Sequence, residues 1–404
     1  MTNKPAILGN TPMFANKVNI VRPVLPQFAD LAADAQEVLL TGMVTKGRHL
    51  RAFEEAIAQH LGVRHAIAVS SCTTGLMLTY KCLGLTGAAV VPSFTFMATV
   101  SSLVWAGLKP VFADVDYRTT NIDPAAAEAA ITPDTSAIIA VHNFGNPADL
   151  EALKSLAERN GLPLICDAAH GFGSLYKGEP VGGQAVAHVF SLSPTKLLIA
   201  GEGGIVATND DDLAEGIRIG REYGNDGHYG SAFAGINARL PEFSALMGLH
   251  SLFQLEEAAR RRNHAAKLYR QALSEIPGIG FQQVSEGNRN SFKDFSITIE
   301  EDHFGVSRDT LASALEAENI DTRNYYDPPV HRHRAYRQFS PPAGSLPNTE
   351  LLATQSLSLP IWSNISDEIV LDICEAISRI QRFASEVSNV TQAVSLRAVA
   401  PSAS

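Results

Sequence analysis

Residues 162–209 read LPLICDAAHGFGSLYKGEPVGGQAVAHVFSLSPTKLLIAGEGGIVATN and contain the two ionisable side chains on which the interpretation of the chain depends. An apolar run, Leu162 to Cys166, ends abruptly in the carboxylate of Asp167. A second apolar run, 187–190, ends in SLSPTK and brings Lys196 to the start of a glycine-rich turn. Both runs have the length and composition of buried strands. The sequence therefore predicts a carboxylate and an amine at strand ends of one sheet.

A carboxylate and a lysine in this arrangement are what a pyridoxal 5'-phosphate (PLP) site requires. The lysine forms a Schiff base with the cofactor, and the carboxylate keeps the ring nitrogen protonated so that the ring can accept electrons. Burial would lower the pKa of Lys196 and make its neutral amine accessible. Each residue also has a purely structural explanation, since Asp167 could cap a turn and Lys196 could reach solvent from a strand end.

Composition limits the class of protein. A chain of 404 residues predicts two domains, and a hydrophobic fraction of 45% with 18% charged residues is typical of a globular protein. The net charge of −10 argues against a nucleic acid or an anionic membrane as partner. No apolar run approaches the ~18–20 residues of a membrane-spanning helix, and the N-terminus lacks the apolar core of a signal peptide. The four cysteines form no CxxC motif, so we expect reduced thiols and a cytoplasmic protein.

Short apolar runs alternate with helical patterns through the first half of the chain. Strands are expected at 66–69, 89–91, 110–113, 137–141 and 162–166, and helices at 74–83, 96–106 and 147–160. This alternation predicts an α/β fold with a mostly parallel sheet, whose ligands bind beyond the carboxyl ends of the strands.

The domain organisation follows from where this alternation begins and ends. We expect an N-terminal arm over 1–30, a large domain over 31–255 and a smaller C-terminal α+β domain over 256–385. One long helix, from about 240 to 273, would bridge the two domains. Residues 386–404 are small and polar, and we expect them to be disordered.

The residues that follow the expected strands suggest a binding site. SSCTTGL, residues 70–76, lies between a strand and a helix, where backbone N–H groups form a ready anion site, and Ser191 could add a hydroxyl. Simple helix capping by Thr73 or Thr74 explains the threonines equally well. Phe96 could stack on a flat ring or pack as part of a lid. No GxGxxG follows a strand, which argues against a dinucleotide.

Three histidines need separate interpretations. His170 follows Asp167 by three residues and could donate to a ligand oxygen or close the turn. His331 and His333 form an HxH within TRNYYDPPVHRHRAY, residues 322–336, but no third ligand is implied and we expect no metal site. Tyr325, Tyr326 and His331 are better interpreted as residues that line a pocket.

The order of these features resembles the DegT/DnrJ family of PLP-dependent nucleotide-sugar aminotransferases, which have the aspartate aminotransferase fold (fold type I). The resemblance covers roughly residues 20–380. It is carried by the segments FEEAIAQHLGVRHAIAVSSCTTGL (53–76), AVHNFGNPAD (140–149), CDAAHGFGS (166–174), FSLSPTKLLIAGEGGIVATND (190–210), GINARLPEFSALMGL (235–249) and SLSLPIW (356–362). It implies a large PLP-binding domain with a mostly parallel sheet and a smaller C-terminal domain.

The resemblance also implies catalytic and cofactor-binding roles. Lys196 would carry the Schiff base and move the proton between cofactor and sugar, and Asp167 would pair with the ring nitrogen. His170 would lie near the 3-hydroxyl of the cofactor, and Phe96 would stack on its ring. The residues implied to hold the phosphate are Cys72, Thr73, Ser191 and, from the neighbouring subunit of a homodimer, Asn237.

The resemblance also suggests residues that would bind the substrate. Arg239, Tyr325, Tyr326 and His331 are the candidates. The family often has Gly or Asn-Gly at position 72, which leaves the backbone contact to phosphate intact. It often has His or Phe at position 193, where this chain has serine, and this region faces the sugar.

The predicted function is transfer of an amino group from an amino acid, glutamate, to a nucleotide-linked keto-sugar, a 4-keto-6-deoxyhexose. Two alternatives stay open. The acceptor could be a 3-keto-sugar or a cyclitol ketone, or the chain could be a regulatory protein that binds PLP or a sugar without turnover. Some relatives lack the lysine, whereas this chain has Lys196.

Overall fold

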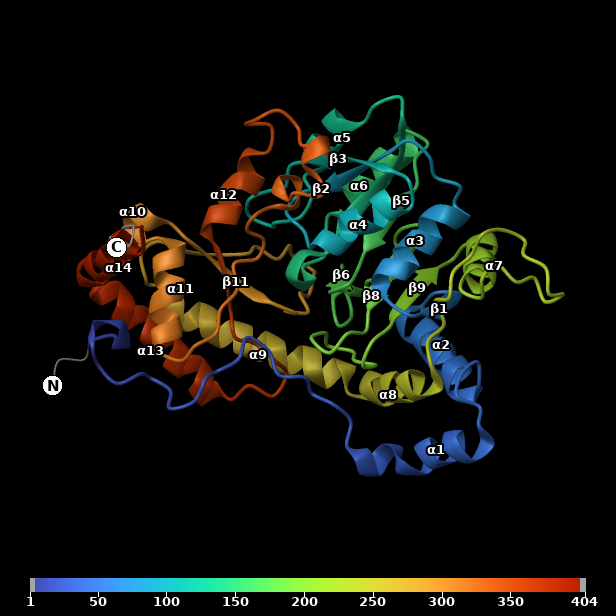
Figure 1. Cartoon of the computed structure of the whole chain (residues 1–404), viewed down its shortest axis with the longest axis horizontal. Helices are drawn as coiled ribbons and strands as arrows, with labels where there is room; N and C mark the ends of the chain where they lie inside the picture. The colour runs from blue at the N-terminus through green and yellow to red at the C-terminus, as the bar shows by residue number, and fades with distance from the viewer. Residues whose placement is uncertain (1–3, 400–404) are drawn as a thin grey trace, which may run out of the picture.

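The centre of the molecule is a seven-stranded sheet, seen in a computed structural model that describes residues 4–399 (Figure 1). Every neighbouring pair is parallel except those of β9, which runs antiparallel to both β1 and β8. The predicted α/β class with a mostly parallel sheet is therefore confirmed, and the carboxyl ends of the other six strands lie at one edge. In spatial order the strands are β1 (His65–Val69), β9 (Gly204–Thr208), β8 (Ala187–Ser191), β5 (Leu164–Asp167), β4 (Thr135–Val141), β2 (Ala88–Pro92) and β3 (Lys109–Ala113).

Helices cover both faces of this sheet, which explains why its strands are apolar along their whole length. In β8, for example, Val189 packs into the core on one face and Phe190 into the core on the other. The helices that contribute to the first core are α3 (Cys72–Cys82), α4 (Met97–Trp105) and α7 (Asp211–Gly220). Those on the opposite face are α2 (Arg48–Leu61), α5 (Pro124–Ala130), α6 (Leu150–Arg159), α8 (Glu242–Phe253) and the start of α9 (Leu255–Leu273).

A second, smaller domain has its own core at the end of α9, to the left in Figure 1. Its sheet is antiparallel, and the far end of α9 packs against it through Tyr269, whose ring stacks on Phe295 at 4.8 Å. The smaller C-terminal α+β domain is thus confirmed. Its elements are β10 (Ile279–Phe281), β11 (Phe295–Ile299), β12 (Ser356–Leu359), α10 (Glu301–Phe304), α11 (Arg308–Ala317), α12 (Pro347–Gln355) and α13 (Asp367–Arg382).

The N-terminal arm packs on the small domain. Ile7 and Phe14 contact its core, and the backbone of Val18 bridges to Ile320. After the arm, helix α1 (Phe28–Thr41) lies at the bottom of Figure 1, where it packs on α8, and its Asp34 and Glu37 pair with Arg48 at the start of α2.

The structure differs from the sequence prediction at the C-terminus. Residues 384–399 form helix α14 (Ala384–Val399), so the expected disorder of 386–404 is wrong for 386–399, while 400–404 lie outside the described residues. The physical reason is tertiary anchoring, because Val387 is fully buried in the core of the small domain and Glu386 pairs with Lys4 of the arm.

Two helix boundaries also differ from the prediction. The expected long helix at 240–273 is two helices, α8 and α9, that meet at Gln254. Helix α3 begins at Cys72 rather than Thr74, because Ser71 is its N-cap and Thr74 completes a capping box with it.

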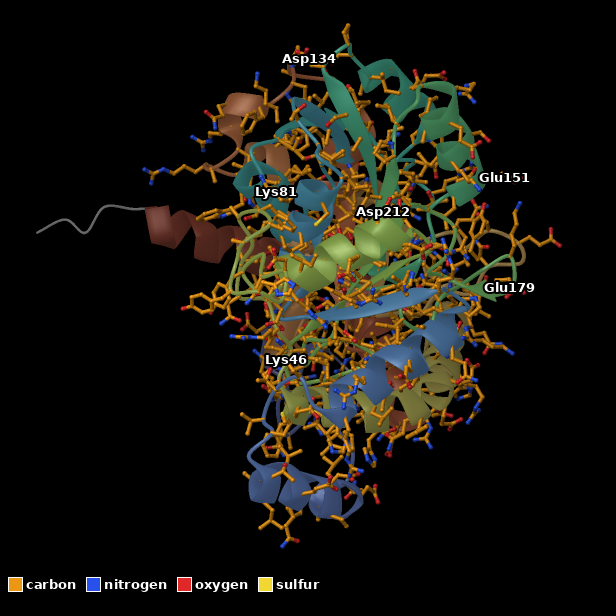
Figure 2. The ribbon with its side chains drawn as sticks, turned by 90° about the vertical axis from the view of Figure 1, so that its right-hand side faces the viewer. Lys46, Lys81, Asp134, Glu151, Glu179 and Asp212 are labelled. Carbon is orange, nitrogen blue, oxygen red and sulfur yellow. The ribbon has the colours of Figure 1, made fainter. Side chains whose placement is uncertain are left out.

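Charged side chains on the surface are spread over many elements. Figure 2 shows labelled examples of both signs at the periphery of the large domain, all of them exposed: Lys46, Lys81, Asp134, Glu151, Glu179 and Asp212. Among the described residues, no helix combines the length and the apolar character needed to cross a bilayer.

Candidate functional site

A cavity of about 390 Å³ lies at the carboxyl ends of the parallel strands and extends to the small domain. Its walls include residues that directly follow β1, β2, β4, β5 and β8, as the parallel topology predicts. Of the sequence-predicted residues, the ones brought together here are Cys72, Thr73, Phe96, Asp167, His170, Ser191, Lys196, Tyr325 and Tyr326.

Asp167 is the last residue of β5 and is only 5% exposed. Its Oδ2 accepts a hydrogen bond from the Thr99 hydroxyl at 2.7 Å, and its Oδ1 accepts one from the Ala169 amide at 3.1 Å. Burial raises the pKa of Asp167, while Thr99, the Ala169 amide and the nearby Lys196 act in the opposite direction. A cationic partner in the cavity would therefore stabilise the ionised carboxylate.

Thr99 was missed by the sequence analysis. It lies within α4, where its residue type alone does not distinguish it from an ordinary helix residue. Its hydroxyl is also 2.9 Å from the hydroxyl of Thr95. The spacing is a weak signal for it, since Thr95, just before the N-cap of α4, and Thr99, in its first turn, are four residues apart just after a strand end.

Lys196 lies in the loop between β8 and β9, and backbone hydrogen bonds within this loop hold it in place. The Lys196 amide donates to the Ser193 carbonyl at 3.0 Å, and Leu192 donates to the Gly203 carbonyl and accepts from the Ala200 amide. Burial and, to a smaller extent, the positive charge of Lys293 lower the pKa of Lys196 to about 8, although the charges of Asp294 and Asp167 act in the opposite direction. A substantial fraction of this lysine is thus neutral near pH 8 and can act as a nucleophile.

The N-terminus of α3 provides an anion cradle. The Ser71 hydroxyl accepts from the Thr74 amide at 3.1 Å, which leaves the first amides of the helix, those of Cys72 and Thr73, without an intrahelical partner. There is no acidic residue in the first turn. Positive helix-dipole charge and two free N–H groups suit a phosphate.

Gly204 of β9 allows the sheet to approach this cradle. A Cβ at Gly204 would lie 2.5 Å from the carbonyl carbon of Ser71 and 2.6 Å from the amide nitrogen of Cys72, closer than any side chain can come. Gly204, the last residue of the glycine-rich GEGG segment (201–204), therefore allows β9 to lie directly against the N-terminus of α3.

The side chain of Cys72 does not face the cradle. Its Sγ donates toward the Val189 carbonyl at 3.3 Å and lies 3.7 Å from Asp167 Oδ1. Burial raises the pKa of this thiol well above its usual range. Cys72 can hold a phosphate only through its backbone.

His170 presents an unsatisfied atom. Its Nδ1 is buried without a hydrogen-bond partner, while its carbonyl accepts from the Ser291 hydroxyl at 2.8 Å. Burial, followed by the positive charge of Lys196, lowers the pKa of His170, so the ring is neutral. A neutral imidazole next to the cavity can exchange a hydrogen bond with a hydroxyl of a ligand.

Aromatic side chains close the cavity on the side of the small domain. Phe96, the N-cap of α4, is 51% exposed and has a face free for stacking. Tyr326 stacks on Phe144 with centroids 5.6 Å apart, and burial raises the pKa of both Tyr325 and Tyr326, which keeps their hydroxyls protonated.

Three predicted residues do not line the cavity. His331 is buried between the Ser93 hydroxyl, 2.7 Å from its Nδ1, and Glu350, 2.9 Å from its Nε2, so its role within this chain is structural and the expected pocket-lining role is not observed. Arg239 pairs with Glu222 at 3.5 Å and lies over the ring of Tyr223. Asn237 is exposed, outside the cavity of its own chain.

A buried ion pair in the cavity wall was also missed. Lys293 and Asp294 are adjacent in sequence, and the Lys293 ammonium contacts both carboxylate oxygens, at 2.8 and 3.0 Å. They precede β11 in the small domain, about 100 residues after Lys196, and no local pattern in SFKDF distinguishes them from an exposed pair.

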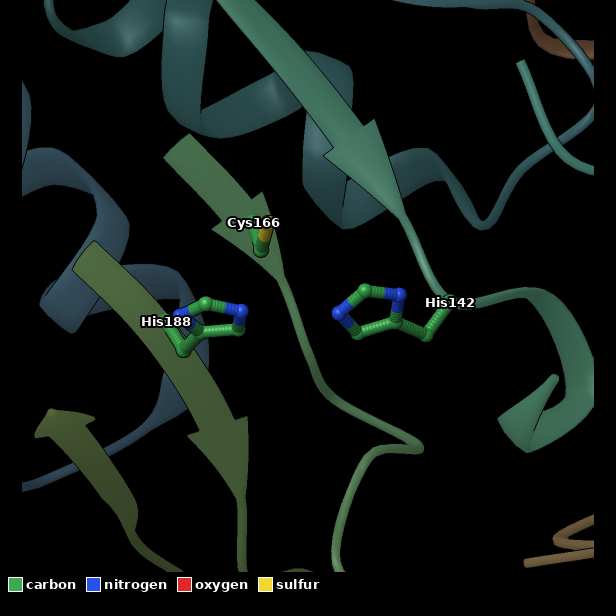
Figure 3. Close-up of side chains that lie close together, drawn as sticks. All are labelled: His142, Cys166 and His188. Carbon is green, nitrogen blue, oxygen red and sulfur yellow. The ribbon is translucent and has the colours of Figure 1, made fainter. Parts of the chain in front are cut away.

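Next to the cavity, His142, Cys166 and His188 form a buried cluster (Figure 3). One ligand-type atom from each lies within 4.8 Å of the others, and both ring nitrogens of His188 lack a partner. The three residues come from or directly follow three neighbouring strands, so sequence spacing does not group them.

The hydrogen bonding of His142 argues against a metal ion in this cluster. Burial lowers the pKa of His142 to about 4, so its ring is neutral. Its Nδ1 accepts from the Ala148 amide at 3.1 Å, which places the single ring proton on Nε2 and removes the lone pair that a metal would need. Burial also raises the pKa of the Cys166 thiol.

The cavity fits PLP by the chemistry of its donors. It offers two free amides for a phosphate, a buried carboxylate for a ring nitrogen, an orphaned imidazole nitrogen for a hydroxyl and an amine whose Nζ makes no hydrogen bond within the described residues. Each of these groups is costly to bury alone and would gain a partner from such a cofactor.

Comparison with known proteins identifies the family of the chain. The sequence profile of the DegT/DnrJ/EryC1/StrS aminotransferase family matches residues 28–378. Spore coat polysaccharide biosynthesis protein SpsC of Bacillus subtilis (strain 168) is 35% identical over 363 residues, covering 86% of this chain and 93% of that protein. A dTDP-3-amino-3,4,6-trideoxy-alpha-D-glucose transaminase of Streptomyces venezuelae is 35% identical over 352 residues, covering 86% of this chain and 91% of that protein.

Solved structures show the same similarity. The crystal structure of DesI in the presence of its TDP-sugar product matches with a TM-score of 0.89 and 36% identity, covering 97% of this chain and 99% of that chain. The structure of DesV from S. venezuelae in complex with a ketimine intermediate matches with a TM-score of 0.83 and 33% identity, covering 92% and 99%.

Proposed function

The chain belongs to the DegT/DnrJ/EryC1/StrS aminotransferase family and is a sugar aminotransferase, and we propose that it uses PLP to move the amino group of glutamate to a nucleotide-linked 4-keto-6-deoxyhexose. One observation carries the proposal. Lys196 and Asp167 reach the same cavity from the ends of neighbouring strands, beside the anion cradle of α3. The TDP-sugar product of DesI supports a nucleotide-linked acceptor.

Named residues would hold the cofactor. The amides of Cys72 and Thr73, with the Ser191 hydroxyl, would bind the phosphate, and Asp167 would pair with the ring nitrogen. His170 would bond the ring hydroxyl, and Phe96 would cover one ring face. When bound, PLP supplies the electron sink that accepts electrons from the broken Cα–H bond of the donor.

The residues of the chain supply proton transfer and charge. With its pKa lowered to about 8, Lys196 can take the proton from the donor carbon and return it during amination of the sugar. Asp167, held by Thr99 and the Ala169 amide, preserves a negative charge at the ring nitrogen. The protonated hydroxyls of Tyr325 and Tyr326 remain available as donors to the substrate.

We propose a cytoplasmic homodimer with shared sites. Asn237 is exposed and lies outside the cavity of its own chain, which is the position expected of a residue that completes the neighbouring site. Helix α1 exposes Phe28, Leu39 and Leu40, an apolar surface that a second copy would cover.

Amination at C-3 is a second candidate. The observation that favours it is the S. venezuelae relative, which is named for a 3-amino sugar and is 35% identical to this chain.

Product analysis tests the proposal. Protein reconstituted with PLP would be incubated with glutamate and a panel of dTDP-linked 3-keto and 4-keto sugars and a cyclitol ketone, and products would be assigned by NMR. We expect an amino group at C-4. A 3-amino product would support the second candidate, and absence of any amino product would contradict both.

A further inference from the structure

We propose that Lys293 binds the carboxylate of the amino-acid donor, and that Asp294 holds the Lys293 ammonium group in place for this purpose. The inference rests on the proposed function, because it names the group that recognises one of the two substrates. Lys293 is a substrate-binding residue in this proposal and takes no part in proton transfer.

The Lys293 side chain occupies a fixed position in the cavity wall. Its backbone amide donates to the Phe144 carbonyl at 3.0 Å, and its own carbonyl accepts from the buried guanidinium of Arg262 at 3.0 Å. Lys293 and Asp294 are 7% and 6% exposed. Such anchoring from the large domain and from α9 makes the ammonium a preorganised group.

The ammonium has hydrogen-bonding capacity to spare. A lysine has three N–H donors, and the two contacts to Asp294, at 2.8 and 3.0 Å, use at most two of them. The other neighbour is the ring of Tyr325, whose centroid is 5.7 Å from Nζ. A buried charged donor without an acceptor is costly, so the remaining N–H is suited to a ligand atom.

The charges that line the cavity favour Lys293 as the carboxylate site. Among the described residues that line it, the cationic side chains are Lys196 and Lys293, since His142 and His170 are neutral. Lys196 has to stay available for reaction at the donor carbon. A carboxylate that enters the cavity therefore finds Lys293 as its cationic partner.

The Lys293–Asp294 pair also suits a cavity that takes two different substrates in turn. The donor carries a carboxylate, whereas the hexose ring of the acceptor is uncharged. A lone buried cation would be left uncompensated whenever the sugar is bound. Asp294 removes this cost, because the pair is internally neutral with the sugar and still offers an N–H to the donor.

The test compares wild-type protein with the double variant Lys293→Met/Asp294→Asn, which removes both charges and avoids an unpaired buried carboxylate, and with Lys293→Arg, which keeps the charge. Isothermal titration calorimetry measures binding of glutarate, a dicarboxylate that cannot react, with dTDP as control ligand. Stopped-flow absorbance of the PLP-loaded protein measures how fast glutamate converts the bound cofactor to its aminated form. A separate experiment measures how fast the keto-sugar nucleotide converts it back.

We expect the double variant to bind glutarate and to use glutamate about tenfold more weakly or worse, since a charge-assisted hydrogen bond is lost. Binding of dTDP and the half-saturating keto-sugar concentration would stay within about twofold, and Lys293→Arg would recover glutarate binding in part. The inference would be overturned if the double variant bound glutarate and glutamate as tightly as wild type. It would also be overturned if the affinities for the donor and for the keto-sugar nucleotide fell equally. Failure of the proposed function looks different: wild-type protein would then not react with glutamate at all.

Discussion

At the scale of single residues, Asp167 depends on Thr99, whose hydroxyl donates the shortest hydrogen bond to the carboxylate, at 2.7 Å. Replacing Thr99 by Val keeps the shape of the side chain and removes the donor. We predict that PLP binds about tenfold more weakly to Thr99→Val, because loss of a hydrogen bond to a charged group raises the pKa of Asp167 and weakens its pairing with the ring nitrogen. Fluorescence titration of apoprotein with PLP measures this, and Thr99→Ser, which keeps the hydroxyl, is the matched control. Equal affinities for wild type and Thr99→Val would contradict the assigned role.

The lowered pKa of Lys196 predicts a pH dependence. The neutral amine is the reactive form, and burial lowers the pKa to about 8, so uptake of PLP by apoprotein should speed up as the pH rises and level off above about 8. Lys196 binds its proton less tightly in the folded protein than in the unfolded chain. Its contribution to the free energy of unfolding therefore increases as the pH rises from about 8 toward the usual lysine pKa near 10.4. The rate of PLP uptake is measured between pH 6.5 and 9.5 as the rate at which the visible absorbance band of the PLP–lysine Schiff base appears. A profile that keeps rising to the usual lysine pKa would show that Lys196 is not desolvated.

The same residues show what the sequence could and could not predict. Asp167 and Lys196 each end or follow an apolar run, and parallel topology brings such ends to one edge, so their meeting was predictable. Thr99 was indicated only weakly, by its spacing from Thr95, and the Lys293–Asp294 pair was not predictable, because these contacts depend on helix direction and on packing of the small domain. His331 was misassigned for the same reason, since its partners Ser93 and Glu350 are distant in sequence.

At the scale of elements, the approach of β9 to the N-terminus of α3 depends on Gly204. We predict that Gly204→Ala weakens PLP binding by about tenfold or more, because its Cβ would displace the backbone of Ser71 and Cys72 that forms the cradle. Gly183→Ala is the control, since a Cβ there would meet Val63 at an ordinary distance of 3.4 Å. Titration with PLP and thermal melts of both variants separate loss of the cradle from loss of the fold. If both variants bind PLP equally well, the cradle is placed wrongly.

Strands β1 to β5 and β8 and helices α3, α4 and α6 were predictable because each is buried on a regular pattern, whereas β9, α5 and α7 were not identified. Helix α14 was not, because its composition is that of a disordered tail and its order depends on one fully buried contact of Val387. The break between α8 and α9 was missed because the helical periodicity is nearly continuous across Gln254. The error at α14 concerns a tertiary contact that overrides local sequence preference.

At the scale of the whole molecule, the proposed shared site predicts complementation between subunits. Lys196→Ala and Asn237→Ala subunits would each be nearly inactive alone. If Asn237 serves the neighbouring site, a mixed dimer has one intact site, so co-expression of the two variants with separately tagged subunits should restore about a quarter of wild-type activity. Light scattering confirms the dimer. Mixed dimers without recovered activity would mean that Asn237 acts within its own chain, and an active Asn237→Ala homodimer would mean that Asn237 serves neither site.

The central claim is that Lys196, of the two lysines in the cavity, is the one that bonds to the cofactor. The most direct measurement is reduction of the PLP-loaded protein with borohydride, followed by peptide mapping by mass spectrometry. The account predicts a single pyridoxyl group on the peptide that contains Lys196. A group on Lys293, or no fixed cofactor, would contradict it.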